Sequence, residues 1–322
     1  MPTPNDLLDV SENRFVLHPI KFPQIFQMGK KAIASFWQVE ELDFNNDVVE
    51  FNRMDADEKH FVLQILAFFA SADGIVIENL VENFCGEVQL PEARYFYSYQ
   101  AFNEQIHSET YARLLQVYAG ESVNELLEEA QASPPVRAKT EFAKKHFDIV
   151  EPDPHKSFAK RLVAFACVEG INFSASFCGI YWLSSRNFEC RALTFSNEFI
   201  ARDEGLHRDF AVKLYKTFMN NLTHEEITQI VKESVQVEEV WVKHALPQPL
   251  TGMNQELMIQ YVRFTADGLL MALDVPAYYK VENPFPFMDA ISVGSKTNFF
   301  ERRVSEYALS SNNEQFNMDA DF

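Results

Sequence analysis

Apolar residues recur along this chain at the spacing of α-helices. In one stretch Tyr95, Tyr99 and Phe102 follow one another at intervals of three and four residues, which places them on one helix face. Four long stretches have this pattern: Phe61 to Phe84, Glu92 to Tyr118, Phe158 to Leu183, and Glu189 to Met219. Shorter helices are predicted at Lys30 to Glu40, Val123 to Ala132, Thr223 to His244, and Asn254 to Leu273. Four long helices with buried faces predict an all-α bundle.

The breaks between the predicted helices are short. Asp55 and Thr223 each stand three residues before a Glu, a spacing that is typical of a helix N-cap. Proline-containing breaks at 133–135 and 151–154 bracket a charged segment that we expect to connect two helices, and the break at 283–286 is expected to end the folded region. We therefore expect one domain over residues 1–300. Residues 301–322, which end in SSNNEQFNMDADF, are polar and are expected to form a flexible tail.

The net charge of -19 argues against a nucleic-acid partner, because neutralising phosphates requires clustered Lys and Arg. The chain contains neither GxGxxG nor GxxxxGK, so a nucleotide-cradling loop is not supported. None of the four cysteines forms a CxxC pair, so neither a zinc knuckle nor a disulfide framework is predicted. Cys167 and Cys178 lie in apolar sequence and are expected to be buried, and a reducing cytoplasm fits best.

One stretch, Leu162 to Leu183, is long and apolar enough to resemble a membrane span. Glu169 and Asn172 lie in its middle, however, and a charge buried in a membrane is costly. A helix buried on all sides in a soluble bundle explains the stretch better. The N-terminus has no basic start and no apolar segment of the kind that secretory signals carry. No membrane partner is expected.

Two of the long helices carry the pattern Glu-x-x-His. The pairs are Glu104 with His107, and Glu204 with His207. Residues three apart share a helix face, so each pair can present a carboxylate oxygen and an imidazole nitrogen to one point. One such pattern arises often by chance, but two on separate long apolar helices are a much stronger signal.

Two further carboxylates interrupt apolar sequence: Asp73 in LAFFASADGIVIENL and Glu169 in LVAFACVEGINF. A buried carboxylate needs a cation, a proton or a metal. Pairing with Arg94 or Arg161 is the ordinary alternative. Taken with the two Glu-x-x-His pairs, however, these residues complete four carboxylates and two histidines from four helices, which is the ligand set of dimetal carboxylate bundles. Four carboxylates balance two divalent ions, and mixed oxygen and nitrogen ligands suit iron or manganese.

The segments around these candidate ligands resemble those of a known family. The strings FFASADGIVIENL, NEQIHSETY, VAFACVEGINFSASF and FSNEFIARDEGLH closely resemble the small subunit of class I ribonucleotide reductase in its eukaryotic-like form, over nearly the whole chain. The resemblance implies a ferritin-like helical bundle with additional helices, and a homodimer. It also implies two iron ions per subunit, oxo-bridged after reaction with O2, although manganese is also possible. The site then makes a tyrosyl radical, with electrons from an external donor, and a separate large subunit reduces ribonucleotides to deoxyribonucleotides.

The resemblance also implies roles for single residues. Tyr111 matches the radical position, and it lies four residues after His107, on the stripe that faces the metals. The apolar pocket around the radical is matched by Phe173, Phe177 and Ile200. The ordinary interpretation of these residues is core packing, which is compatible with lining the pocket.

Radical transfer is assigned by the resemblance to Trp37, Asp203 and Tyr307. Trp37 supplies an oxidisable ring, and Asp203 orients the ligand His107. Docking on the large subunit is assigned to the chain end, whose contact residues are Phe316, Met318, Asp319, Asp321 and Phe322. Without the resemblance, Trp37 would be read as a core aromatic residue and Tyr307 as an inert residue of the tail.

Two other functions remain open from the sequence. A metal-dependent oxidase or oxygenase of the same bundle would act on its own small substrate, and an iron-binding protein of the ferritin type would only store metal. Neither has a use for Tyr307 or for the tail at 316–322. The main expectation is therefore the radical-generating subunit of ribonucleoside-diphosphate reductase.

Overall fold

The structure is a computed structural model that describes residues 2–10 and 12–288, apart from the side chains of residues 12, 13, 72, 73 and 75. Regular structure in this part of the chain is helical, with one isolated bridge between Leu250 and Met253. The helices of the first half are α1 (Pro4–Leu8), α2 (Pro23–Ala34), α3 (Asp47–Arg53), α4 (Ala56–Asn79), α5 (Cys85–Glu87), α6 (Pro91–Ala119) and α7 (Val123–Ala132). Those of the second half are α8 (Pro134–Phe147), α9 (Pro154–Cys167), α10 (Ser174–Ser185), α11 (Arg191–Leu214), α12 (His224–Ala245) and α13 (Gln255–Ala272). The all-α prediction is confirmed.

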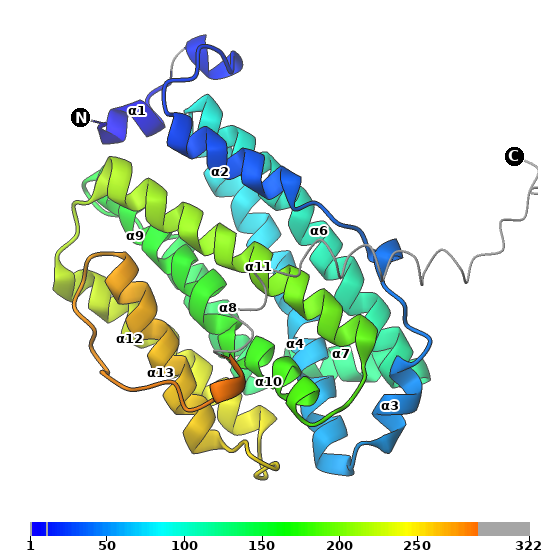
Figure 1. Cartoon of the computed structure of the whole chain (residues 1–322). Helices are drawn as coiled ribbons and strands as arrows, with labels where there is room; N and C mark the ends of the chain where they lie inside the picture. Colours follow the sequence, from blue (N-terminus) through cyan, green and yellow to red (C-terminus); the bar gives the residue numbers. More distant parts are fainter. Residues whose placement is uncertain (1, 11, 289–322) are drawn as a thin grey trace, which may run out of the picture.

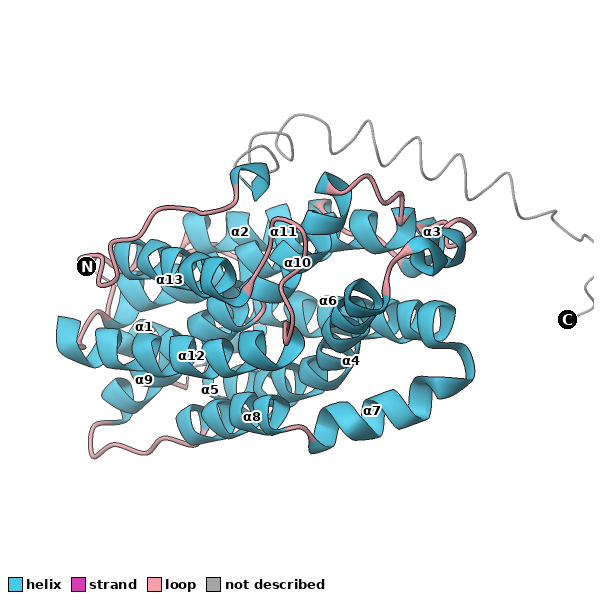
Figure 2. Ribbon diagram, turned by 90° about the horizontal axis from the view of Figure 1, so that it is seen from below, coloured by secondary structure: helices cyan, strands magenta, loops and turns pink. Residues whose placement is uncertain are grey.

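Long helices pack side by side around one core. α6 packs against α2 and α4, and α11 packs against α9, while α12 packs against α8, α9 and α13 (Figure 1). Figure 2 shows α3 and α7 on the side opposite to α1, α9 and α13. The predicted boundary between residues 300 and 301 lies outside the described residues.

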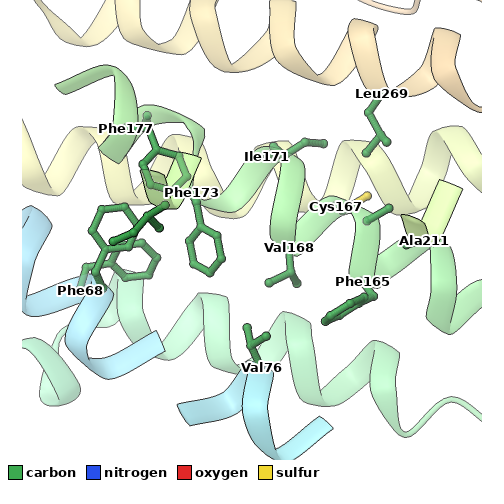
Figure 3. Packing of buried hydrophobic residues seen from close by; sticks show 14 of the residues in the cluster. Phe68, Val76, Phe165, Cys167, Val168, Ile171, Phe173, Phe177, Ala211 and Leu269 are labelled. Atoms are coloured by element: carbon green, nitrogen blue, oxygen red, sulfur yellow. The ribbon is translucent and has the colours of Figure 1, made fainter. Parts of the chain in front are cut away.

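Three of the long helices contain or end in π-helical turns, in which one extra residue is accommodated within the helix. The turns are η3 (Leu80–Phe84), η5 (Val168–Asn172) and η6 (Tyr215–Met219). η5 joins α9 to α10, so the predicted helix from Phe158 to Leu183 has an interruption at its centre. In Figure 3 Val168 of this turn points toward Val76 of α4, whereas Ile171 points to the opposite side.

The core between these helices is rich in aromatic rings. The rings of Phe68 and Phe173 lie 5.9 Å apart, and Phe177 lies beside them (Figure 3). Cys167 and Cys178 are buried as predicted, and burial raises the pKa of both thiols. Two stretches, Ala56–Glu87 and Pro154–Ser185, are long and apolar enough to cross a membrane, but 94% of the tested window in the second is buried within the protein. That burial is the pattern of a core helix.

Asp47 of α3 fixes the start of α11. Its carboxylate accepts hydrogen bonds from the backbone amides of Ala192 and Leu193, both at 3.0 Å, and from the hydroxyl of Tyr118 at 2.7 Å. Burial raises the pKa of this carboxyl group, and its hydrogen bonds oppose the rise. The group therefore joins α3 and α6 to the first turn of the helix that carries Glu204.

Both predicted N-caps are confirmed, because Asp55 and Thr223 accept hydrogen bonds from amides three residues later. The predicted helix from Lys30 to Glu40 is wrong. α2 begins at Pro23, whose missing N–H costs nothing in a first helical turn, and it ends at Ala34. The chain then leaves the helix and buries Trp37.

The charged segment after residue 135 is a helix rather than the expected connector. Pro134 occupies the first turn of α8, where proline is tolerated. Val136, Lys139, Phe142 and His146 are buried at intervals of three and four residues along it. Because many residues of this segment are charged, its buried face could not be recognised from the sequence.

Candidate metal centre

Five of the six predicted ligands have described side chains, and all five are buried together. α6 contributes Glu104 and His107, α11 contributes Glu204 and His207, and η5 contributes Glu169. Each of these side chains belongs to a residue that is at most 3% exposed. One ligand atom from each of four of them, all except His107, lies within 4.8 Å of the other three.

His107 lies directly beside this group. Its Nδ1 atom is 3.2 Å from Glu104 Oε2 and 3.1 Å from Glu204 Oε1. His207 Nδ1 lies 2.9 Å from the other oxygen of Glu104 and 3.1 Å from Glu204 Oε2. Both Glu-x-x-His pairs therefore converge on one point, as their spacing predicts. The sixth predicted ligand, Asp73, lies within α4, and its side chain is outside the described residues.

Glu169 is contacted by a side-chain amide. Gln100 Nε2 of α6 donates a hydrogen bond to Glu169 Oε1 at 3.1 Å. The two arginines proposed as ordinary partners bind elsewhere: Arg94 donates to backbone carbonyls at residues 85 and 88, and Arg161 pairs with Glu87. Gln100 is four residues before Glu104, so its place on the ligand face could have been read from the sequence.

The cluster has a strongly negative potential. Burial favours the neutral form of His207, but the charges and hydrogen bonds of Glu104 and Glu204 outweigh burial and raise its pKa to about 9. Burial also opposes the charged form of His107, yet hydrogen bonds to Asp203, Glu104 and Glu204 hold its pKa well above the usual value. A potential that draws protons onto two buried imidazoles also attracts cations.

The donor set fits two divalent ions. Three carboxylates cannot share a dry volume of this size unless positive charge balances them. Oxygen and nitrogen donors together suit iron or manganese, whereas a structural zinc site uses four ligands and often sulfur. The residues present are therefore chemically suited to a dimetal centre.

Tyr111 lies four residues after His107 on α6 and is 2% exposed. Its ring stacks on Phe69 of α4, with 4.4 Å between centroids and 11° between planes. Phe177 and Phe173 lie 5.1 Å and 5.7 Å from the same Phe69 ring, and Ile200 is buried on α11. Sequence reasoning missed Phe69, although it stands four residues before Asp73 and so shares that face of α4.

Asp203 joins Trp37 to His107. Trp37 Nε1 donates to Asp203 Oδ2 at 2.8 Å, and His107 Nε2 lies 3.3 Å from the same oxygen. Asn103 Nδ2 also donates to this oxygen at 3.3 Å. Arg202 donates to Oδ1 from Nε at 3.0 Å and from Nη2 at 2.7 Å. Burial raises the pKa of Asp203, but the hydrogen bond to His107 and the charge of Arg202 outweigh burial and lower it.

Sequence reasoning missed Asn103 and Arg202. Asn103 directly precedes Glu104, and Arg202 directly precedes Asp203. Neighbouring residues of a helix do not share a face, however, so their contact with this site could not be predicted from their position in the sequence. The remaining predicted residues lie outside the described part of the chain: Tyr307, Phe316, Met318, Asp319, Asp321 and Phe322.

Comparisons with known proteins agree with this architecture. A family model described as "Ribonucleotide reductase, small chain" matches residues 14–284. The ribonucleoside-diphosphate reductase small chain of Nicotiana tabacum is 47% identical over 98% of both chains. The small chain of Trypanosoma brucei brucei is 46% identical over 98% of this chain and 95% of that one.

Solved structures are similar as well. The ribonucleotide reductase Rnr4 homodimer from Saccharomyces cerevisiae superposes with a TM-score of 0.80 at 32% identity, covering 94% of this chain and 93% of that one. The dimanganese(II)-NrdF of Streptococcus sanguinis superposes with a TM-score of 0.71 at 16% identity, covering 88% and 98%. The second likeness shows the fold alone.

Proposed function

The chain belongs to the small-chain family of ribonucleotide reductase, and on this premise we propose that it generates a radical on Tyr111 for use by a large subunit that reduces ribonucleotides. The observation that carries the proposal is the burial of three carboxylates and two histidines at one point of the core. Such a cluster is costly to bury without metal. A tyrosine on the same helix as two of the ligands supplies a group to oxidise.

Six side chains would hold the metals: Asp73, Glu104, His107, Glu169, Glu204 and His207. Iron is the metal we propose, as the eukaryotic-like motifs favour it, and manganese accepts the same ligands. When bound, the pair of ions supplies the oxidising power of O2 for removing one electron from a nearby phenol. The carboxylates balance the charge of the ions, and Gln100 holds the orientation of Glu169 by donating to its Oε1.

The surroundings of Tyr111 protect a radical. Oxidation of the phenol removes one electron and one proton from it, and the product persists only where water and reductants are excluded. The stacked ring of Phe69 covers one face of Tyr111, and Phe173 and Phe177 close the space behind that ring. Tyr111 is only 2% exposed as a result.

Asp203 connects the metal ligand His107 with Trp37. Because its Oδ2 contacts both Trp37 Nε1 and His107 Nε2, it can accept the indole proton when an electron leaves Trp37, and return it afterwards. Arg202 holds the other carboxylate oxygen and keeps the group fixed. We propose that the path continues from Trp37 to Tyr307, which passes the radical to the large subunit.

The remaining assignments complete the proposal. The chain acts as a homodimer in the cytoplasm and docks on the large subunit through residues 301–322. Phe316, Met318 and Phe322 would fill apolar pockets there, while Asp319 and Asp321 would meet basic groups. The chemistry of the bound metals would also require an external electron donor, and the deoxyribonucleotides formed would serve DNA replication.

Electron paramagnetic resonance tests the proposal. The purified chain is loaded with ferrous iron without oxygen and then exposed to O2. We expect two irons per chain and a tyrosyl signal, and parallel loading with manganese shows which metal supports it. The absence of a signal with both metals, in protein that contains two ions per chain, would contradict radical generation.

A further inference from the structure

A second buried polar cluster lies against the turn that carries Glu169. It consists of Lys139 of α8, Asn172 of η5, and Ser234 and Glu238 of α12, and is called here the Asn172 anchor. Lys139 is 6% exposed, Asn172 is 2% exposed, and the other two are fully buried. The sequence reasoning and the proposed chemistry give no role to Lys139, Ser234 or Glu238.

The anchor holds Asn172 by its backbone and by its side chain. Lys139 Nζ donates to the carbonyl oxygen of Asn172 at 2.5 Å and lies 2.5 Å from Glu238 Oε2. Ser234 Oγ donates to Asn172 Oδ1 at 2.5 Å. Two neighbouring helices therefore hold the last residue of η5.

Aromatic rings and a small cavity border this cluster. Lys139 Nζ lies 3.6 Å from the ring centroid of Phe68 and 4.8 Å from that of Trp241, so aromatic faces cover the ammonium group. A cavity of about 30 Å³ beside it is lined partly by Phe68, Val168 and Phe173, three residues that Figure 3 shows close to one another. The ammonium group thus sits between the aromatic core and η5.

The opposite side of η5 is also packed closely. A Cβ atom placed on Gly170 would lie 2.6 Å from Cδ of Arg208, a residue of α11. Because glycine has no Cβ, the aliphatic part of the Arg208 side chain can pack directly against the backbone of Gly170. η5 is therefore packed between α11 and the Asn172 anchor, and Glu169 lies immediately before Gly170 and three residues before Asn172.

Stability alone does not explain a buried Lys–Glu pair, because well-packed apolar side chains of similar volume are often equally or more stable. Burial lowers the pKa of Lys139 to about 8 and raises that of Glu238 to about 7, while the attraction between the two groups opposes both shifts. The nitrogen of Lys139 carries hydrogens whether it is charged or neutral. Its bond to the Asn172 carbonyl therefore survives either protonation state.

We propose that Lys139, Ser234 and Glu238 are positioning residues for the metal centre: they fix the end of η5 and so hold Glu169, three residues before Asn172, in place for metal binding. This inference rests on the proposed function, because it takes Glu169 to be a ligand. Residues that orient ligands in this way affect metal affinity without touching the metal.

The test compares a double variant with a matched control. Lys139→Met with Glu238→Gln removes both charges while keeping side-chain volume, so no charge is left unpaired in the core. The control is Lys145→Met, which breaks the exposed ion pair of 2.7 Å between Lys145 and Glu233 on the same two helices. Manganese binding to the metal-free chain is measured without oxygen. We expect affinity to fall about tenfold in the double variant and to stay unchanged in the control.

Amide hydrogen exchange of the metal-free chain gives an independent measurement. We expect exchange over residues 168–177 to be faster in the double variant than in the parent, because the end of η5 has lost its donor. Manganese affinity and exchange that both equal those of the parent would overturn the proposal. If the double variant does not fold, Ser234→Ala removes one hydroxyl only, and we expect a loss of affinity of about threefold; unchanged affinity there would overturn it equally.

The outcome separates this inference from the proposed function. A parent chain that binds no manganese contradicts the metal centre itself, whatever the variants do. A parent that binds two ions, next to a double variant with unchanged affinity and exchange, contradicts only the role of Lys139 and Glu238.

Discussion

Replacing Trp37 with Phe tests the proposed path of radical transfer from the metal centre. The indole is fully buried, its Nε1 donates to Asp203 Oδ2 at 2.8 Å, and its ring lies 5.1 Å from that of Phe199 and 6.1 Å from that of His107. Phe keeps an aromatic ring at this position. It removes the hydrogen-bond donor, leaves unfilled volume and is much harder to oxidise.

The expected cost in stability follows from these contacts. A hydrogen bond to a charged group contributes about 1.5–3 kcal/mol, and the lower value applies because Asp203 keeps Arg202 and Asn103. The lost ring volume adds about 1 kcal/mol. The sum, about 2.5 kcal/mol, should lower the midpoint of thermal unfolding by about 4 °C in a chain of this size.

Function should change far more than stability. Trp37→Phe should bind two metal ions and form the Tyr111 radical, yet show no ribonucleotide reduction with the large subunit. Trp182→Phe is the matched control, because Trp182 is equally buried and its Nε1 donates to the carbonyl of Thr251 at 2.9 Å. That variant should lose similar stability and keep turnover. Full turnover by Trp37→Phe would remove this residue from the path, and an unchanged unfolding midpoint would refute the energetic reasoning.

Four further outcomes are expected. Tyr111→Phe should still bind metal and consume O2 but give no tyrosyl signal in paramagnetic resonance; a persistent signal would move the radical to another residue. Glu169→Ala should lose metal, because the charge balance of the cluster changes by one, and two ions per chain in elemental analysis would refute its role as a ligand. Asp47→Ala should lower stability by about 2–4 kcal/mol in thermal unfolding, because it leaves two buried amides and a phenol without their acceptor. Deletion of residues 316–322 should abolish association with the large subunit in sedimentation while leaving the radical intact; normal association would place the docking site elsewhere.

The sequence predicted the centre well where helical periodicity determines geometry. The pairs at Glu104 and Glu204 needed only a spacing of three residues, and their long apolar helices ensured that both pairs faced the core. Tyr111 lies on the same helix stripe, but its role as the radical site is what the family resemblance implies. Its ring partner Phe69 was missed, because a run of apolar residues on α4 does not say which ring will stack.

Other features depend on contacts that one sequence does not encode. Lys139 lies among charged residues, so its burial follows from the packing of α8 on α12 and not from any local pattern. Trp37 was predicted to be helical, but tertiary contacts with Asp203 and Phe199 outweigh helix propensity there. The π-helical turns also escaped prediction, because inserting one residue leaves apolar residues on both sides in apparently continuous helical sequence.

The extra residue in η5 makes this stretch sensitive to its length. Removal of any one residue between 168 and 172 would let α9 continue into α10 as a regular helix. Everything beyond the deletion would then turn by about 100° around the helix axis and shift by about 1.5 Å along it. The side chains of α10, which are buried from Ser174 to Leu183, would then face the wrong neighbours. Single substitutions here should therefore be survivable more often than single deletions, and related chains should keep the residue count between Cys167 and Ser174 even where the identities differ.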